Sequence, residues 1–226
     1  MSPALPPIDV RRYGAGEPRI LLLHGGPGGA GYMRPLAREL SDEFAALEPL
    51  QRAAGIVPLT VAQHVEDLDG IVRTLQGPAI LVGSSWGAML ALSYAARFPS
   101  RVSKIVAIGC GTFDRASRKV YHDRLAAMAS PEIARERDEL RRALGRADDR
   151  NSRLRVFERL VRIDTRLQSF DPLTDDLEIV NLDLEGRQET WTDVLRLQDD
   201  GVQPAEFAAI TAPVVMLHGD TDPHPG

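Results

Sequence analysis

Ser85, placed between two glycines, is the side chain in this sequence best suited to act as a nucleophile. It lies at the centre of Gly83-Ser84-Ser85-Trp86-Gly87, which fits G-x-S-x-G and directly follows the apolar run Ala79 to Val82. A helical pattern at 88–97 begins at once, so we expect a sharp strand-to-helix turn that lifts the serine above a sheet. Small residues are needed on both sides because the backbone passes close to the helix and the strand. The pattern predicts acyl transfer at Ser85; the alternative is a chance match in a glycine-rich turn.

A glycine-rich loop after another apolar run could stabilise the charge that forms during such a reaction. His24-Gly25-Gly26-Pro27-Gly28-Gly29 follows Ile20 to Leu23 and can present backbone N–H groups unobstructed by side chains. Two such donors stabilise the tetrahedral oxyanion of acyl transfer, and we assign them to Gly26 and Trp86. The alternative is a phosphate-binding loop. The run lacks the lysine and Ser/Thr ending of a Walker motif and the spacing of a dinucleotide fingerprint.

A third group of polar residues follows the apolar run Val214 to Leu217. His218-Gly219-Asp220-Thr221-Asp222 contains two aspartates at the end of a predicted strand. A carboxylate there could hold an imidazole in its working tautomer and stabilise the imidazolium that forms when a serine loses its proton. On position alone, either Asp220 or Asp222 could serve, and either could merely solvate a turn.

The base that such a serine needs would be a histidine. A base must lie between the serine and the acid, with one ring nitrogen for each. His224 is a possible base, but it is only two residues from Asp222, and the flanking Pro223 and Pro225 restrict the backbone. The other four histidines have simpler interpretations: His24 shapes the glycine-rich loop, His64 lies on a helix surface, His122 could contact substrate, and His218 ends a strand.

The surrounding pattern predicts an α/β protein with a mostly parallel sheet and flanking helices, because short apolar runs alternate with helical periodicity. Thr60 with Gln63 forms a capping box before a helix whose apolar residues recur at three and four residues. We expect strands at 8–13, 19–23, 44–47, 79–82, 104–108 and 214–217, with the last a buried strand.

The middle of the chain differs in character. We expect residues 113–205 to form an inserted helical cap, between a first core part at 1–112 and a second at 206–226. Ser130 and Pro131 are typical of a helix N-terminus. The arginines of 135–166 alternate with acids, which favours a solvated, salt-bridged helical face.

The composition limits the partners and the location. A formal net charge of -5 argues against nucleic acid and anionic membranes, since both require a basic surface. The single cysteine, Cys110, ends an apolar run and is expected in the core. The first ten residues show neither a basic segment nor a continuous apolar run, so we expect a cytoplasmic location.

Three of these motifs together resemble the α/β-hydrolase superfamily, and within it the proline-iminopeptidase-like branch. They are HGGPG at 24–28, GSSWG at 83–87 and HGDTD at 218–222. The resemblance implies an α/β-hydrolase fold with a cap and a chain order of Ser, Asp, His. The family's G-x-x-D pattern selects Asp222 as the acid. In the family, the catalytic histidine follows the acid by two to three dozen residues. We therefore expect this histidine to lie beyond Gly226, and we expect the sequence to be truncated at its C-terminus.

The function that the resemblance implies is a serine hydrolase. It would cleave an ester or amide bond through an acyl-enzyme at Ser85, without metal or organic cofactor, and act on a small ester, amide or short peptide. The alternative is a catalytically incomplete protein of the same fold that binds a small ligand.

Overall fold

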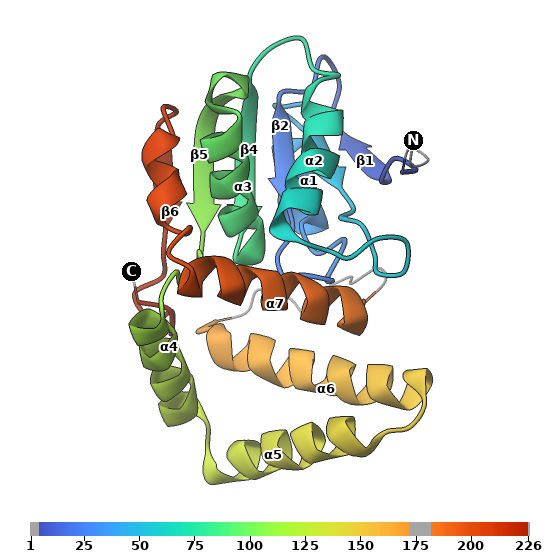
Figure 1. Ribbon diagram of the computed structural model, residues 1–226, viewed down its shortest axis with the longest axis vertical. Coiled ribbons are helices and arrows are strands. Elements are labelled where there is room, and N and C mark those ends of the chain that lie inside the picture. The colour runs from blue at the N-terminus through green and yellow to red at the C-terminus, as the bar shows by residue number, and fades with distance from the viewer. Residues whose placement is uncertain (1–4, 172–181, 226) are drawn as a thin grey trace. The chain divides into compact units, whose positions relative to one another are not determined.

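The computed structural model describes residues 5–171 and 182–225, which fall into two compact units. The first unit comprises residues 5–111 and 182–217, and the second comprises 112–171 and 218–225. Figure 1 shows a sheet with helices on its faces in the first unit and helices alone in the second. Among the described residues, no helix is long and apolar enough to cross a membrane.

The first unit is built on a six-stranded sheet in the order β1-β3-β2-β4-β5-β6. β1 pairs antiparallel to β3, and the other neighbouring strands are parallel. The mostly parallel sheet predicted from the sequence is therefore confirmed. The strands are β1 Val10–Tyr13, β2 Ile20–Leu23, β3 Ala46–Pro49, β4 Ala79–Ser84, β5 Val102–Ile108 and β6 Val214–Leu217.

Side chains of the central strands alternate between two helical layers, because successive residues of a strand point to opposite faces. On one face, Ile20, Leu22 and Val82 pack in a cluster with residues of α1 (Arg34–Leu40). The other face is covered by α2 (Val61–Val72) and α3 (Trp86–Arg97), which lie in front of the sheet in Figure 1. The predicted cap of α2 is confirmed, since the Thr60 hydroxyl accepts the Gln63 N–H at 3.1 Å. A 3-10 turn at Pro99–Arg101 joins α3 to β5.

Expected strand limits differ from the observed ones by up to two residues: β1 begins at Val10 rather than Ile8, and β5 begins at Val102 rather than Lys104. Two further strand predictions need correction. The strand expected at 44–47 begins two residues later, since Phe44 is exposed and β3 starts at Ala46. The buried strand expected at 214–217 exists, but it is exposed: Met216 and Leu217 keep 55% and 52% of their surface. Among the described strands, β6 pairs with β5 alone and forms one edge of the sheet.

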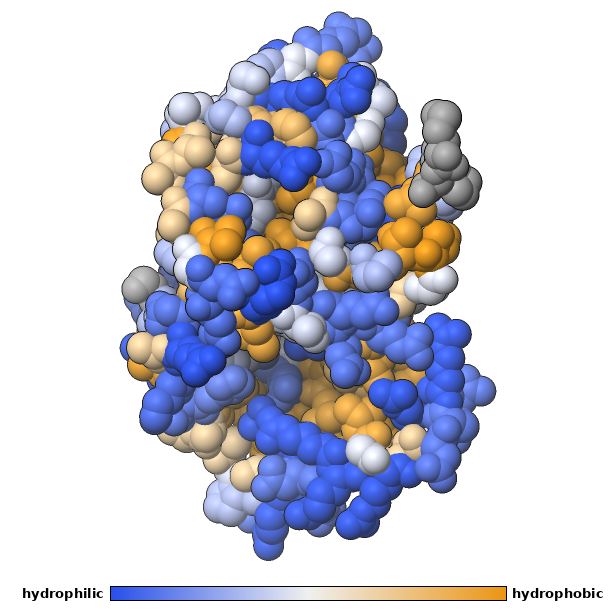
Figure 2. All heavy atoms as spheres, in the orientation of Figure 1, coloured by the Kyte–Doolittle hydropathy of each residue, from blue (hydrophilic) through white to orange (hydrophobic). Residues whose placement is uncertain are grey.

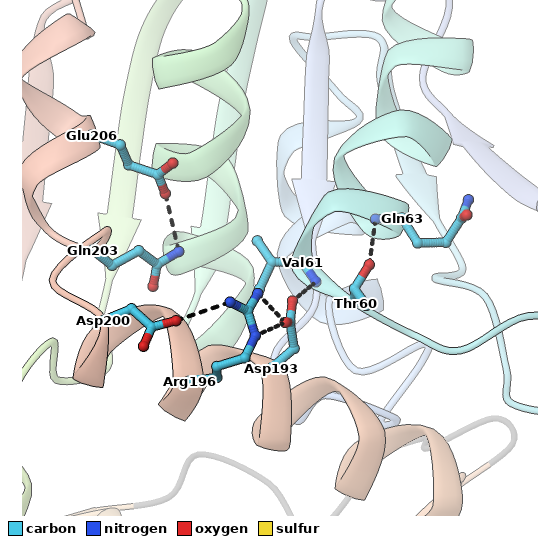
Figure 3. A network of polar contacts seen from close by, with 8 residues as sticks. All are labelled: Thr60, Val61, Gln63, Asp193, Arg196, Asp200, Gln203 and Glu206. Carbon is cyan, nitrogen blue, oxygen red and sulfur yellow. Dashed lines mark hydrogen bonds and ion pairs between the residues drawn. The ribbon is translucent and has the colours of Figure 1, made fainter.

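The helix α7 (Leu184–Asp199) also belongs to the first unit and crosses the carboxyl-terminal ends of the parallel strands (Figure 1). Asp193 of α7 accepts the N–H of Val61, the first residue of α2, at 2.8 Å. Arg196 pairs with Asp193 and Asp200 on the side of α7 where Asp193 meets Val61 (Figure 3). A 3-10 turn at Ala205–Ala209 then leads to β6 and packs on α3.

The second unit contains three amphipathic helices, α4 (Arg115–Met128), α5 (Pro131–Arg146) and α6 (Arg150–Gln168). The predicted start of α5 is confirmed, since the Ser130 hydroxyl accepts the Ile133 N–H and proline follows it. Ion pairs link α5 and α6, with Arg159 Nε 2.8 Å from Glu136 Oε1 and Arg137 Nε 2.8 Å from Asp164 Oδ1. Hydrophilic residues dominate the surface over α5 at the bottom of Figure 2, in agreement with the predicted solvated face.

The expected division into core and cap stays a prediction. The contacts group α7 with the sheet, whereas the sequence placed 113–205 together in the cap. They also group residues 218–225 with the helices of the second unit rather than with the core. Cys110 is buried, as its position at the end of an apolar run predicts, and burial raises the pKa of its thiol to about 12.

Candidate active site

Ser85 lies at a strained turn between β4 and α3. Its backbone has φ 52° and ψ −118°, and among the described residues it is the only one other than glycine with a positive φ. The Ser85 N–H donates to the carbonyl of Ile108 on β5 at 2.9 Å, while its own carbonyl accepts the N–H of Ala88 at 3.0 Å. Ser85 therefore takes part both in a hydrogen bond to the neighbouring strand β5 and in the first hydrogen-bonded turn of α3. Such strain is typical of functional positions.

The glycines on either side of Ser85 are required by close backbone contacts. A Cβ on Gly83 would lie 2.2 Å from the carbonyl oxygen of Gly87. A Cβ on Gly87 would lie 2.0 Å from the carbonyl oxygen of Leu23, at the end of β2. Both distances are far shorter than any real Cβ contact, so the spacing of the motif follows from the packing of α3 against β2 and β4.

The glycine-rich loop lies directly beside the serine. A Cβ on Gly25 would lie 3.0 Å from the Cβ of Ser85. Tyr32 holds the two segments together: its hydroxyl accepts the Gly25 N–H at 2.8 Å and donates to the carbonyl of Ser84 at 3.3 Å. Burial raises the pKa of Tyr32, so the hydroxyl keeps the proton it donates.

His24 fixes the orientation of the peptide that carries the Gly26 N–H. Its Nδ1 lies 2.9 Å from the carbonyl oxygen of Gly25, and its Nε2 lies 3.2 Å from the N–H of Gln51. These partners require a proton on Nδ1 and a lone pair on Nε2. Burial lowers the pKa of His24 to about 4, which keeps the ring in that neutral form at pH 7. Because the C=O and N–H of a trans peptide point in opposite directions, holding the Gly25 carbonyl also directs the Gly26 N–H.

Gln51 links this loop to the second predicted oxyanion donor. Its side-chain Nε2 donates to the carbonyl of His24 at 2.8 Å, and its Oε1 accepts the indole N–H of Trp86 at 2.8 Å. Trp86 is fully buried as the first residue of α3. The backbone N–H of a first helical residue has no carbonyl partner within its helix, which suits it to an oxyanion.

The prediction that His64 lies on the surface is wrong. Its side chain is 3% exposed, its Nε2 lies 2.9 Å from the Thr190 hydroxyl, and its ring meets that of Trp86 edge to face at 5.7 Å. Burial lowers the pKa of His64 to about 4. Its spacing from Val61 and Leu68 places it on the apolar face of α2, and this is the signal that could have revealed its burial.

The second unit brings Asp222 and His224 together. Asp222 Oδ1 accepts the backbone N–H of His224 at 2.8 Å and lies 2.7 Å from its Nδ1. The His224 ring stacks on Tyr121 at 4.2 Å, and the carbonyl of His224 lies 2.9 Å from His218 Nε2. Asp220 is exposed. Of the two aspartates, Asp222 is the one that binds an imidazole.

The predicted site residues therefore occupy two places. Ser85, Gly26 and Trp86 belong to the first unit, where backbone contacts tie their segments together, and Asp222 with His224 belongs to the second. Sequence reasoning missed the side chains that hold the glycine-rich loop, because a single polar or aromatic residue, whether in a loop or in a helix, forms no pattern that reveals its partner. Those residues are Tyr32, Gln51, Arg187 and Trp191.

The sheet order and the strand-to-helix turn at Ser85 define an α/β-hydrolase fold. A family model described as alpha/beta hydrolase fold matches residues 18–224, and the chain belongs to this family. The 2-(acetamidomethylene)succinate hydrolase of Mesorhizobium japonicum is 37% identical over 107 residues, which are 45% of this chain and 38% of that protein.

A proline iminopeptidase of Pestalotiopsis fici is 28% identical over 135 residues, 54% of this chain and 48% of that protein. Each match thus spans less than half of the curated relative. The crystal structure of proline iminopeptidase from Mycobacterium smegmatis superposes with a TM-score of 0.55 at 18% identity, over 95% of this chain and 78% of that one. This last similarity supports the fold alone.

Proposed function

We propose that the protein hydrolyses an ester or amide bond through an acyl-enzyme on Ser85. The observation that carries the proposal is the positive φ of Ser85 at a turn whose neighbours admit only glycine. A strained turn of this kind persists only where the surrounding structure fixes it, and it presents the hydroxyl beside a loop rich in backbone donors. The curated relatives are named as hydrolases and a proline iminopeptidase, which agrees with this class of reaction.

The proposed reaction has two steps. Ser85 Oγ attacks the carbonyl carbon of the substrate, its proton passes to a base, and the negative charge on the carbonyl oxygen is bound by the N–H groups of Gly26 and Trp86. The base then gives its proton to the departing alcohol or amine. Water, activated by the same base, releases the acid from Ser85 and restores the hydroxyl.

In this proposal Asp222 orients the base. Within the second unit, Asp222 Oδ1 lies 2.7 Å from Nδ1 of His224, which is the kind of contact that a triad acid makes with a histidine. Two candidates for the base are tested: a histidine beyond Gly226, where the family resemblance places it, and His224. We expect the same small ester, amide or short-peptide substrates as the sequence suggests, with a proline-iminopeptidase-like preference as one of the activities to assay.

The experiment is covalent labelling with a fluorophosphonate, followed by peptide mass spectrometry. Ser85→Ala should abolish labelling, whereas the matched variant Ser84→Ala should keep most of it. Labelling of Ser85→Ala at the rate of the unmodified protein would refute the assignment of the nucleophile. Labelling without turnover of activated esters would instead indicate a competent nucleophile that lacks its base, and the absence of labelling would favour a small-ligand-binding protein of the same fold.

The base is tested with the same reagent. Asp222→Asn should slow labelling by at least two orders of magnitude, because the serine is a weak nucleophile at its own pKa. A loss of the same size in His224→Gln would make His224 the base, and an unchanged rate would leave that role to a histidine beyond Gly226. Asp220→Asn is the matched control and should have little effect, since Asp220 is exposed. If only Asp222→Asn slowed the reaction, another histidine would be the base.

A further inference from the structure

The helix α7 is attached to the loops at the strand ends by carboxylates that bind backbone N–H groups. Asp183 Oδ2 accepts the N–H of Ala54 at 2.7 Å, and Glu189 Oε2 accepts that of Leu59 at 2.9 Å. Asp193 binds the N–H of Val61, as Figure 3 shows. These three contacts anchor the length of α7 to the segment before α2 without involving the glycine-rich loop.

A second set of contacts from α7 reaches the glycine-rich loop itself. The guanidinium of Arg187 and the indole N–H of Trp191, the latter at 3.3 Å, both donate to the carbonyl oxygen of Gly26. At the start of the helix, the Asp183 N–H donates to the carbonyl of Gly28 at 2.9 Å. Two side-chain donors, one of them charged, therefore converge on one carbonyl of the proposed oxyanion-binding residue.

Gly26 cannot fix its own orientation. It has φ 116°, a conformation that glycine adopts freely and other residues rarely adopt, so its neighbours must select it. The peptide that follows it ends in Pro27, which has no N–H, and its carbonyl is thus the group through which it can be held. His24 holds the peptide before Gly26, and the two donors of α7 hold the peptide after it.

We propose that Arg187 and Trp191 are positioning residues of the oxyanion hole. They bind the Gly26 carbonyl and so keep the Gly26 N–H directed at the charge that forms on the substrate. The inference rests on the proposed function, because it names residues that support the same site. Neither side chain is proposed to touch the substrate.

The test uses substitutions that remove a donor and keep the packing. Trp191→Phe removes the indole N–H and retains an aromatic ring, and Arg187→Met removes the guanidinium and retains the stem. Arg187→Lys keeps a charged donor and should recover part of the effect. The matched control is Arg196→Met, on the same helix, whose side chain pairs with Asp193 and Asp200.

We expect Trp191→Phe and Arg187→Met to lower both the fluorophosphonate labelling rate and kcat for an activated ester tenfold or more. KM should stay within about twofold, because a lost oxyanion contact acts on the transition state rather than on substrate binding. Arg196→Met should leave both rates unchanged. Unchanged rates in both test variants, or a loss confined to KM, would overturn the inference.

A second measurement does not depend on activity. In protein labelled with ¹⁵N-glycine, the amide of Gly26 should shift and exchange faster with solvent in both test variants, and not in the control. If Ser85 of the unmodified protein were never labelled, the proposed function would fail, and the Gly26 amide would still report on positioning. An unperturbed Gly26 amide in both variants would refute the positioning role.

Discussion

Replacing Ser85 with glycine should stabilise the protein although it removes the candidate nucleophile. A non-glycine residue at φ 52°, ψ −118° costs on the order of 1–3 kcal/mol. Glycine relieves that strain but adds roughly 0.5–1 kcal/mol of backbone entropy to the unfolded chain. The net gain in the free energy of unfolding lies between about 0 and 2.5 kcal/mol, and the middle of the two ranges gives about 1 kcal/mol.

The gain can be measured against a variant that removes only the hydroxyl. Ser85→Ala keeps the Cβ and the strain, so Ser85→Gly should unfold at a higher temperature than Ser85→Ala. With an unfolding entropy of roughly 2 cal/mol/K per residue, a gain of about 1 kcal/mol in a chain of 226 residues gives a difference of about 2 °C. Ser84→Gly, one residue earlier in β4, should instead be destabilised by about 0.5–1 kcal/mol. Equal or lower stability of Ser85→Gly would show that the turn is not strained.

Two further predictions concern stability. His24 and His64 have pKa values lowered to about 4 and are neutral in the folded protein at pH 7, whereas they take up protons near pH 6.5 when unfolded. Their contribution to the free energy of unfolding is present above pH 6.5 and is lost as the pH falls toward 4, by roughly 3 kcal/mol for each histidine. The free energy of unfolding, measured with urea between pH 7 and 4.5, should depend less on pH in His64→Gln than in the unmodified protein. An identical pH dependence in the two proteins would contradict the burial argument. Gly87→Ala should fail to fold or lose more than about 3 kcal/mol, because its Cβ would meet backbone at 2.0 Å. Gly70→Ala on α2, where nothing lies within 4 Å, should gain about 0.5–1 kcal/mol, and similar changes in the two alanine variants would refute the packing argument.

The parts of the fold that the sequence predicted are those with a local cause. The turn at Ser85 follows from two glycines after a buried strand, and the start of α2 follows from the Thr60 cap, so both could be located by inspection. The antiparallel pairing of β1 with β3 could not be predicted from the sequence, because it depends on contacts between segments more than thirty residues apart.

α7 shows why other parts could not be predicted. It is a polar helix whose attachment uses Asp183, Glu189 and Asp193 as acceptors for backbone N–H groups. Hydrophobic periodicity indicates the apolar face of a helix, but it does not indicate hydrogen bonds between side-chain carboxylates and backbone N–H groups.

The glycines of the site leave the backbone conformationally free, and the residues that contact them orient its N–H groups. Glycine is needed at Gly25 and Gly26 so that backbone N–H groups can approach Ser85, yet the same absence of a side chain leaves those groups unoriented. An oxyanion hole is effective only when its donors are fixed before the charge appears. These donors are oriented by Tyr32, His24 and α7, which bind the Gly25 N–H, the Gly25 carbonyl and the Gly26 carbonyl, respectively. A chain that kept HGGPG and GSSWG but lost these partners would retain the motifs and lose the geometry, so the partners are the better markers of a working site.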